Sequence, residues 1–173
     1  MAPYPKEWER HFTLPDGKPV YVRPIRPDDE ALYAPFFAAE TADDLRLRFF
    51  APVKDFGHAF VARFTHIDYA RAMAFIALDE ATGEMLGVAR LHAIPEENSG
   101  EFAILVRTDL KAHGFGWQLM QLIIEYARAK GFGSVQGQVL RENTAMLQMC
   151  AELGFAIVTD PAEPYICDVK LGL

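Results

Sequence analysis

The chain has 173 residues, of which 51% are apolar and 24% charged, so we expect one globular domain over residues 1–173 whose core needs no disulfide or metal. Residues 1–17 should form an N-terminal extension and the start of a hairpin. The formal charge of −7 argues against a nucleic-acid partner, which would need a basic surface. No apolar stretch approaches the ~20 residues of a membrane span, and no signal peptide is visible. With only two cysteines, we expect a cytoplasmic protein without a membrane partner.

Motifs of several enzyme classes are missing. The chain has two serines, Ser99 and Ser134, and neither stands in a G-x-S-x-G motif, which disfavours a nucleophile-elbow hydrolase. The motifs H-E-x-x-H, C-x-x-C and G-x-x-x-x-G-K-S/T do not occur either. The sequence therefore offers no basis for a zincin, zinc-ribbon or P-loop function, and we expect no bound metal.

The first half of the chain predicts a hairpin followed by helices. Residues 12–26 alternate around a Pro-Asp-Gly turn. A helix should begin near Pro27, and Pro35 should break or kink it. Further helices are expected over residues 41–50, from a capping-box-like opening at Thr41, and over residues 57–64. A phenylalanine-rich stripe is interpreted as core, and a loosely covered part of it could form an acceptor surface: Phe36, Phe37, Phe49, Phe50, Phe56, Phe60 and Phe64.

The second half predicts a sheet with two helices. Strands are expected over residues 73–78, 85–94, 101–107, 134–140, 155–158 and 165–171. A strongly periodic helix should follow Gly116 and end at Gly131, and another should cover residues 143–153. The buried face of the first is predicted to hold Leu119, Met120, Ile123, Ile124 and Ala127. This order predicts a mixed α/β (α+β) fold, a central sheet flanked by helices.

The segment most informative about function is the loop before the periodic helix. Free amides and the positive dipole end of a helix form an anion site suited to pyrophosphate. Gly114 and Gly116 would let the backbone approach a phosphate, and Arg107, Lys111 and His113 would supply positive charge. A tight turn without a ligand is the alternative. A dinucleotide fingerprint is disfavoured, because its third glycine is missing.

Residues 106–119 (VRTDLKAHGFGWQL) resemble motif A of the GNAT acyltransferases, Gln/Arg-x-x-Gly-x-Gly/Ala between a strand and a helix, with Lys111 at the first position. Residues 143–155 (NTAMLQMCAELGF) are similar to the family's later cofactor-contacting segment. The resemblance covers about residues 18–171 and implies the GNAT fold, a mostly antiparallel mixed sheet splayed in the middle. Four shorter segments resemble the catalytic domain of bacterial protein lysine acetyltransferases: RPIRPDD (23–29), LRFF (47–50), IDY (67–69) and AFIAL (74–78).

This resemblance implies acetyl-CoA as co-substrate and assigns roles to residues. The cofactor-binding residues would be Ile104, Leu105, Val106, Arg107, Lys111, Ala112, His113, Gly114, Phe115, Gly116, Trp117 and Asn143. Glu101 matches the family's general base, which removes a proton from the attacking amine; the alternative is a solvated strand end. Cys150 stands where the family often has a tyrosine that protonates the leaving thiolate. Either Cys150 or solvent would then do so, and a small core cysteine is the competing interpretation.

Three functions remain open at this point. The first is an N-acetyltransferase that modifies a lysine side chain of a protein, with an acyl-CoA synthetase as the target by analogy. The second is an acetyltransferase for a small amine, an amino acid or an antibiotic. The third is a catalytically silent module that senses CoA. The sequence leaves the oligomeric state open, and the acceptor remains either a protein lysine or a small amine.

Overall fold

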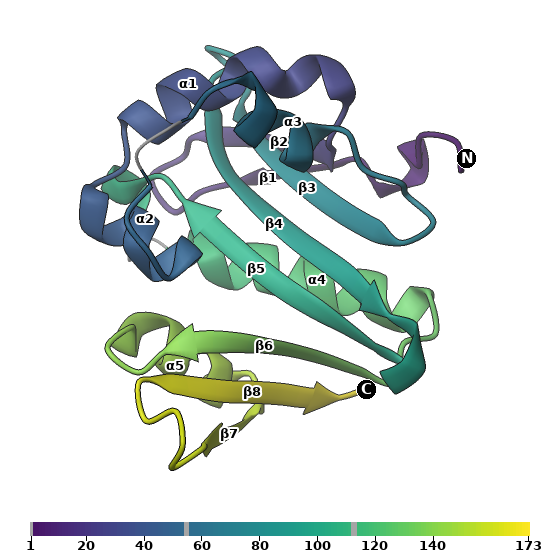
Figure 1. Ribbon diagram of the computed structural model, residues 1–173. Helices are drawn as coiled ribbons and strands as arrows, with labels where there is room; N and C mark the ends of the chain where they lie inside the picture. The colour runs from purple at the N-terminus through teal and green to yellow at the C-terminus, as the bar shows by residue number, and fades with distance from the viewer. Residues whose placement is uncertain (1, 54–55, 112–113) are drawn as a thin grey trace.

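The computed structural model describes residues 2–53, 56–111 and 114–173 (Figure 1). The α-helices of this part are α1 (Glu30–Ala38), α2 (Ala42–Phe49), α3 (His58–Thr65), α4 (Phe115–Ala129) and α5 (Thr144–Glu152). Its strands are β1 (Arg10–Thr13), β2 (Pro19–Pro24), β3 (Ala72–Asp79), β4 (Met85–Ile94), β5 (Ser99–Val106), β6 (Ser134–Leu140), β7 (Ala156–Thr159) and β8 (Ile166–Gly172). Short 3-10 turns are η1 (Lys6–Trp8), η2 (Pro27–Asp29), η3 (Pro95–Glu97) and η4 (Thr108–Leu110). None of the helices in these ranges is long and apolar enough to cross a bilayer.

One sheet joins all the strands in the order β1-β2-β3-β4-β5-β6-β8-β7. Neighbouring strands are antiparallel except β5 and β6, which are parallel and pair only from Ser99↔Ser134 to Glu101↔Gln136. Beyond Glu101 the two strands separate, and Figure 1 shows them diverging toward α2 and α5. This confirms the predicted mixed, mostly antiparallel sheet that is splayed in the middle.

Helices cover both faces of the sheet, and each face has its own core. The α4 core includes Phe102 and Ile104 of β5, whereas the core beneath α1, α2 and α3 includes Leu105. Side chains of a strand alternate between faces, so β5 contributes to both. Six of the seven stripe phenylalanines pack in or against the second core, and Phe50 is 37% exposed.

Most of the predicted elements are confirmed, and α1 shows the main departure. The predicted face of α4 is buried throughout. Helix α1 continues through Pro35 to Ala38 and is therefore not broken there. An interior proline costs ~3 kcal/mol. Burial of Tyr33, Phe36 and Phe37, at roughly 1.5–3 kcal/mol for each large apolar side chain, exceeds that cost, and Pro35 itself lies on the exposed face.

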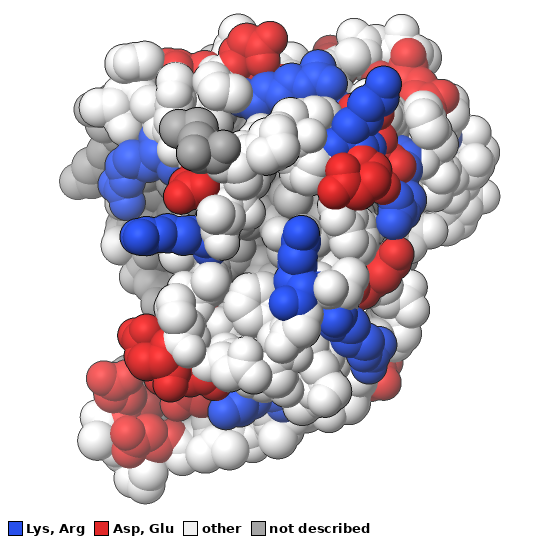
Figure 2. Space-filling model, turned by 90° about the vertical axis from the view of Figure 1, so that its right-hand side faces the viewer, with Lys and Arg blue, Asp and Glu red and all other residues white. Residues whose placement is uncertain are grey.

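The surface carries both signs of charge. On the face shown in Figure 2, acidic and basic side chains are interspersed, and acidic side chains gather at its lower left. The net charge of −7 is therefore not a uniform field over this face. Local sites of either sign can exist on such a surface.

Candidate active site

The main cavity lies where β5 and β6 separate, and its volume is about 550 Å³, within the usual ~300–1,000 Å³ of a small-molecule site. Its walls come from β5, β6, α2, α5 and the start of α4. The lining residues are Asp44, Leu47, Arg48, Phe49, Phe50, Glu101, Phe102, Ala103, Ile104, Leu105, Val106, Lys111, Gly114, Gly116, Trp117, Gln138, Val139, Asn143, Ala145, Met146 and Met149. The splay of the sheet therefore produces the site.

The beginning of α4 forms one end of the cavity. Gly114 is its N-cap with φ +77°, a left-handed conformation that favours glycine. A Cβ on Gly116 would meet only Met149 Sδ at 3.9 Å, so the backbone there is open to the cavity. The first amides of an α-helix have no acceptor inside the helix. The start of α4 therefore fits an anion such as pyrophosphate.

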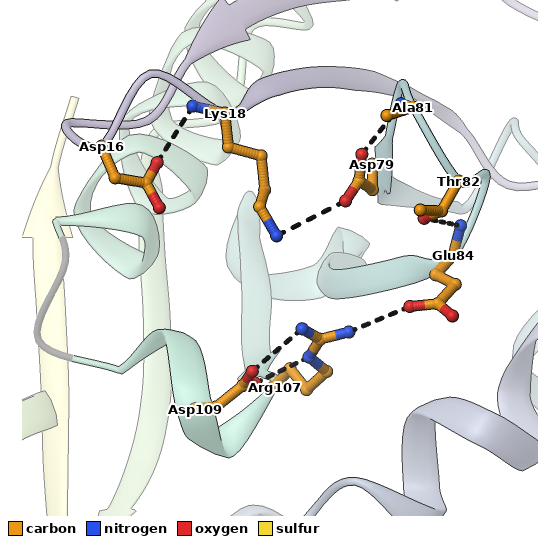
Figure 3. A network of polar contacts seen from close by, with 8 residues as sticks. All are labelled: Asp16, Lys18, Asp79, Ala81, Thr82, Glu84, Arg107 and Asp109. Atoms are coloured by element: carbon orange, nitrogen blue, oxygen red, sulfur yellow. Dashed lines mark hydrogen bonds and ion pairs between the residues drawn. The ribbon is translucent and has the colours of Figure 1, made fainter.

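The basic side chains assigned to this end are already paired with carboxylates. Arg107 donates to Asp109 at 2.7 and 2.9 Å and to Glu84 at 3.3 Å (Figure 3), and it does not line the cavity. Lys111 does line it, but its Nζ lies 2.5 Å from Asp44 Oδ1. The predictions for Ala112 and His113 lie outside the described residues. In the described part of the loop, the anion site therefore depends mainly on backbone amides.

Glu101 stands at the closed end of the splay. It is the last residue of β5 that pairs with β6, and its side chain is exposed and lines the cavity. On β4 its partner is His92. A carboxylate at this point can accept a proton from a group bound between the strands.

The remaining assigned cofactor residues divide into lining and core positions. Ile104, Leu105 and Val106 of β5 line the cavity beyond the last pair with β6, so their backbone has no strand neighbour on that side. Trp117 and Asn143 also line it, and Asn143 Oδ1 accepts a hydrogen bond from Met146 N as the N-cap of α5. Phe115 is 1% exposed and packs in the α4 core. It can reach a ligand only through its backbone.

Cys150 is not brought to the cavity. Its side chain is fully buried in the α4 core, and burial raises the pKa of its thiol to about 11. The residues of α5 that line the cavity are Ala145, Met146 and Met149. Among the residues that the structure describes, no group of three or more His, Cys, Asp or Glu side chains could hold a metal ion.

Sequence reasoning did not assign a role to the wall formed by α2. Arg48, at the end of this helix, lines the cavity, and so does Phe50, which has φ +65° although it is not glycine. The signal was present as two arginines, Arg46 and Arg48, within the phenylalanine-rich stripe. The stripe was interpreted as core, with a loosely covered part as a possible acceptor surface, and the cations within it received no role.

Comparisons with known proteins agree with this geometry. Residues 38–155 match the model of the acetyltransferase (GNAT) family. The acetyltransferase PA5475 of Pseudomonas aeruginosa is 32% identical over 151 residues, which are 86% of this chain and 81% of that protein. The structure of the GNAT domain of S. lividans PAT superposes with a TM-score of 0.89, 26% identity and coverage of 99% of this chain and 100% of that one. Spermidine N-acetyltransferase from Vibrio cholerae, solved with CoA and spermine, shares the fold at a TM-score of 0.70 and 16% identity, over 88% of this chain and 95% of that one.

The sheet is mixed and splayed, and at its cleft two glycines leave the start of a helix open to the cavity. This arrangement defines the class of acyl-CoA-dependent acyltransferases with the GNAT fold. The chain belongs to the GNAT acetyltransferase family, as the family match and the relative in P. aeruginosa show. It is an acetyltransferase of a family that uses acetyl-CoA as co-substrate.

Proposed function

We propose that the chain transfers an acetyl group from acetyl-CoA directly to a primary amine, in first place the side chain of a protein lysine, with Glu101 as the general base. The observation that carries this proposal is the position of Glu101, in the same cavity as the open start of α4. The pyrophosphate would bind at the amides of α4. The pantetheine arm would lie along the free edge of β5 and bring the thioester toward Glu101.

The chemical difficulty is the charge of the amine. A lysine with a pKa of ~10.4 is almost entirely protonated at neutral pH, which costs ~4 kcal/mol before it can attack. Glu101 takes one proton from the ammonium group, the amine nitrogen bonds to the thioester carbon and releases its second proton to solvent, and the C–S bond breaks with its electron pair on sulfur. A backbone N–H of β5 would stabilise the oxyanion. Because Cys150 lies in the core, solvent would protonate the leaving thiolate.

The test of the base is Glu101→Gln. This change keeps the shape of the side chain but removes its ability to accept the proton. We expect kcat to fall by about 10²–10⁴-fold, the usual contribution of general acid–base catalysis, while acetyl-CoA binds as before. The matched control is Glu97→Gln, a change at an exposed position of η3. Wild-type turnover by Glu101→Gln would remove this residue from the base role.

The acceptor class is tested by an assay with acetyl-CoA and two sets of amines, read by mass spectrometry. One set holds purified proteins, acyl-CoA synthetases among them, because the GNAT domain of S. lividans PAT is similar to this chain. The other holds polyamines and amino acids. We expect acetylation confined to particular protein lysines. Efficient acetylation of a small amine with no labelled protein would assign the chain to the second class.

A further inference from the structure

The side of the cavity formed by α2 holds a cation that has no acidic partner among the described residues. Arg48 has no carboxylate within ion-pair distance and no hydrogen-bond acceptor among the residues that the structure describes, although a guanidinium carries five N–H donors. Its guanidinium carbon lies 4.6 Å from the centre of the Phe49 ring. The other arginine of α2, Arg46, pairs with Asp43 and Glu142. Within the described part of the chain, Arg48 is therefore a cation of this wall that has no carboxylate partner.

A second cation lies behind Arg48. A small cavity of about 10 Å³ adjoins the main one and shares Arg48, Phe49 and Leu105 with it. Arg90 of β4 lines this small cavity, stacks on Phe64 at 4.8 Å and donates to the Phe64 carbonyl. Two guanidinium groups thus meet at the inner wall.

A buried hydroxyl also faces this place. Tyr33 is 2% exposed and lines the small cavity, and its Oη has no hydrogen-bond partner in the described part of the chain. Burial raises the pKa of Tyr33, and Arg90 lies close enough to lower it through its charge and a weak hydrogen-bonding contact, but this contact lacks the geometry of a full hydrogen bond. A buried hydroxyl without a partner is costly. It fits a site where a ligand or a water supplies the missing contact.

The electrostatics of Arg48 agree with an anion site. Burial, together with the charge of Arg90, lowers its pKa to about 10, while Tyr33 and Glu101 act in the opposite direction. Arg48 therefore stays charged at neutral pH, within the electrostatic range of the base. A negative group bound here would relieve the repulsion between Arg48 and Arg90.

We infer that Arg48 is a specificity residue that binds a carboxylate of the substrate beside the transferred acyl group, with Arg90 and Tyr33 behind it. A carboxylate matches the planar fork of a guanidinium better than other common anions of its size, because both can form two parallel hydrogen bonds. Two sources would supply it: the far end of a dicarboxylic acyl chain on CoA, or the acceptor amine. The inference rests on the proposed function, since it places the acyl group in the same cavity.

Two arms of one experiment distinguish the sources. In the first, succinyl-CoA is compared with butyryl-CoA, which has the same number of acyl carbons and no charge. In the second, acetyl-CoA is used with free lysine and with lysine amide as acceptors. Each ratio of kcat/KM is measured for the wild type, for Arg48→Gln and Arg48→Lys, and for Arg128→Gln as a control. Arg128 lies exposed in the last turn of α4, away from the end that lines the cavity.

In one arm, we expect the wild type to prefer the carboxylate-bearing substrate by at least about 10-fold, the range of a charge-assisted hydrogen bond. Arg48→Gln should reduce this preference to less than about 3-fold. Arg48→Lys should fall between the two, since it keeps the charge but loses the fork. The control should match the wild type. The arm that responds identifies the source.

Absence of a wild-type preference in both arms would overturn the inference, and this result does not depend on the folding of any variant. A preference that Arg48→Gln leaves intact would overturn it too. Dissociation constants of succinyl-CoA and butyryl-CoA, measured alongside, require no turnover. Acetyl transfer without carboxylate preference therefore rejects the inference alone, whereas carboxylate-selective binding without any transfer rejects the proposed function alone.

Discussion

At the scale of single residues, the hydroxyl group of Thr108, next to the loop that precedes α4, contacts two carboxyl groups at once. Thr108 Oγ1 lies 2.9 Å from Glu40 Oε2 and 2.6 Å from Asp44 Oδ2, and it accepts from Thr41 N at 3.1 Å. A hydroxyl has one proton, so it can donate to only one of the two carboxylates. The other contact requires a protonated carboxyl group.

Glu40 is the carboxyl group suited to hold that proton. Burial raises its pKa to about 7; the contact with Thr108 opposes the rise, and the charge of Asp44 adds to it. For Asp44, burial also works to raise the pKa, but the hydrogen bonds from Lys111 and Thr108 lower it overall. Below neutral pH the two acids therefore differ in charge, with Asp44 ionised and Glu40 mostly protonated.

This difference predicts a pH-dependent effect of Glu40→Gln on stability. The pKa of Glu40 is 4.5 in the unfolded chain and about 7 in the fold, so the folded state holds the proton more tightly. The stabilisation that results is fully present below pH 4.5 and is lost as the pH rises to 7. The variant does not titrate there. The unfolding free energy of the variant relative to the wild type should therefore increase between pH 5 and pH 8, by up to roughly 3 kcal/mol. Its melting temperature relative to the wild type should increase over the same range.

The comparison is made by thermal unfolding at several pH values, with Glu97→Gln as the exposed control that should follow the wild-type curve. A constant difference between Glu40→Gln and the wild type over the whole range would show that Glu40 is not protonated in the fold.

At the scale of elements, a substitution at the start of α4 should change the affinity for acetyl-CoA without lowering the stability of the fold. In Gly116→Ala the added Cβ meets only Met149 Sδ at 3.9 Å, an ordinary contact, so the melting temperature should not fall. Alanine also suits a helix better than glycine by ~1 kcal/mol. The same Cβ would occupy the approach of the pyrophosphate, and we expect acetyl-CoA to bind at least about 10-fold more weakly, measured by calorimetry.

The matched control is Gly172→Ala near the end of β8, where an added Cβ has no neighbour within 4 Å. It should leave both the melting temperature and the affinity unchanged. Wild-type affinity in Gly116→Ala would mean that the cofactor does not lie over the start of α4.

The elements also show what could be predicted from the sequence. Helix α4 was predictable because its apolar residues recur with the helical period, and the five residues predicted for its buried face are all buried. The continuation of α1 through Pro35 was not, because it depends on the packing of Phe36 and Phe37 in a core that the local sequence does not reveal. Local preference is decided there by tertiary contacts.

The site follows the same rule. Gly114 and Gly116 were predictable because a glycine pattern is local. The pairing of Lys111 with Asp44 was not, since the two lie 67 residues apart in the sequence. Arg107 pairs with Asp109, only two residues away, and also with Glu84, 23 residues away, and only the second of these contacts depends on the fold. Arg48 was overlooked for the same reason, because its role depends on Arg90 and Tyr33 from other elements.

At the scale of the whole molecule, the cavity stands between the two parts of the sheet. Strands β5 and β6 hold these parts together through only a short run of pairs, and α2 faces α5 across the cavity. Arg46 of α2 pairs with Glu142, which precedes α5. A ligand that fills the cavity would add contacts to both parts at once, so binding should stabilise the entire fold.

The most direct test of this account is the melting temperature of the chain with and without acetyl-CoA. At a concentration 100 times its Kd, a ligand adds ~2.7 kcal/mol to the unfolding free energy. For a chain of this size, each kcal/mol raises the melting temperature by about 2–4 °C, so we expect an increase of about 5–10 °C. The same melting temperature at every concentration of acetyl-CoA up to millimolar would contradict the account.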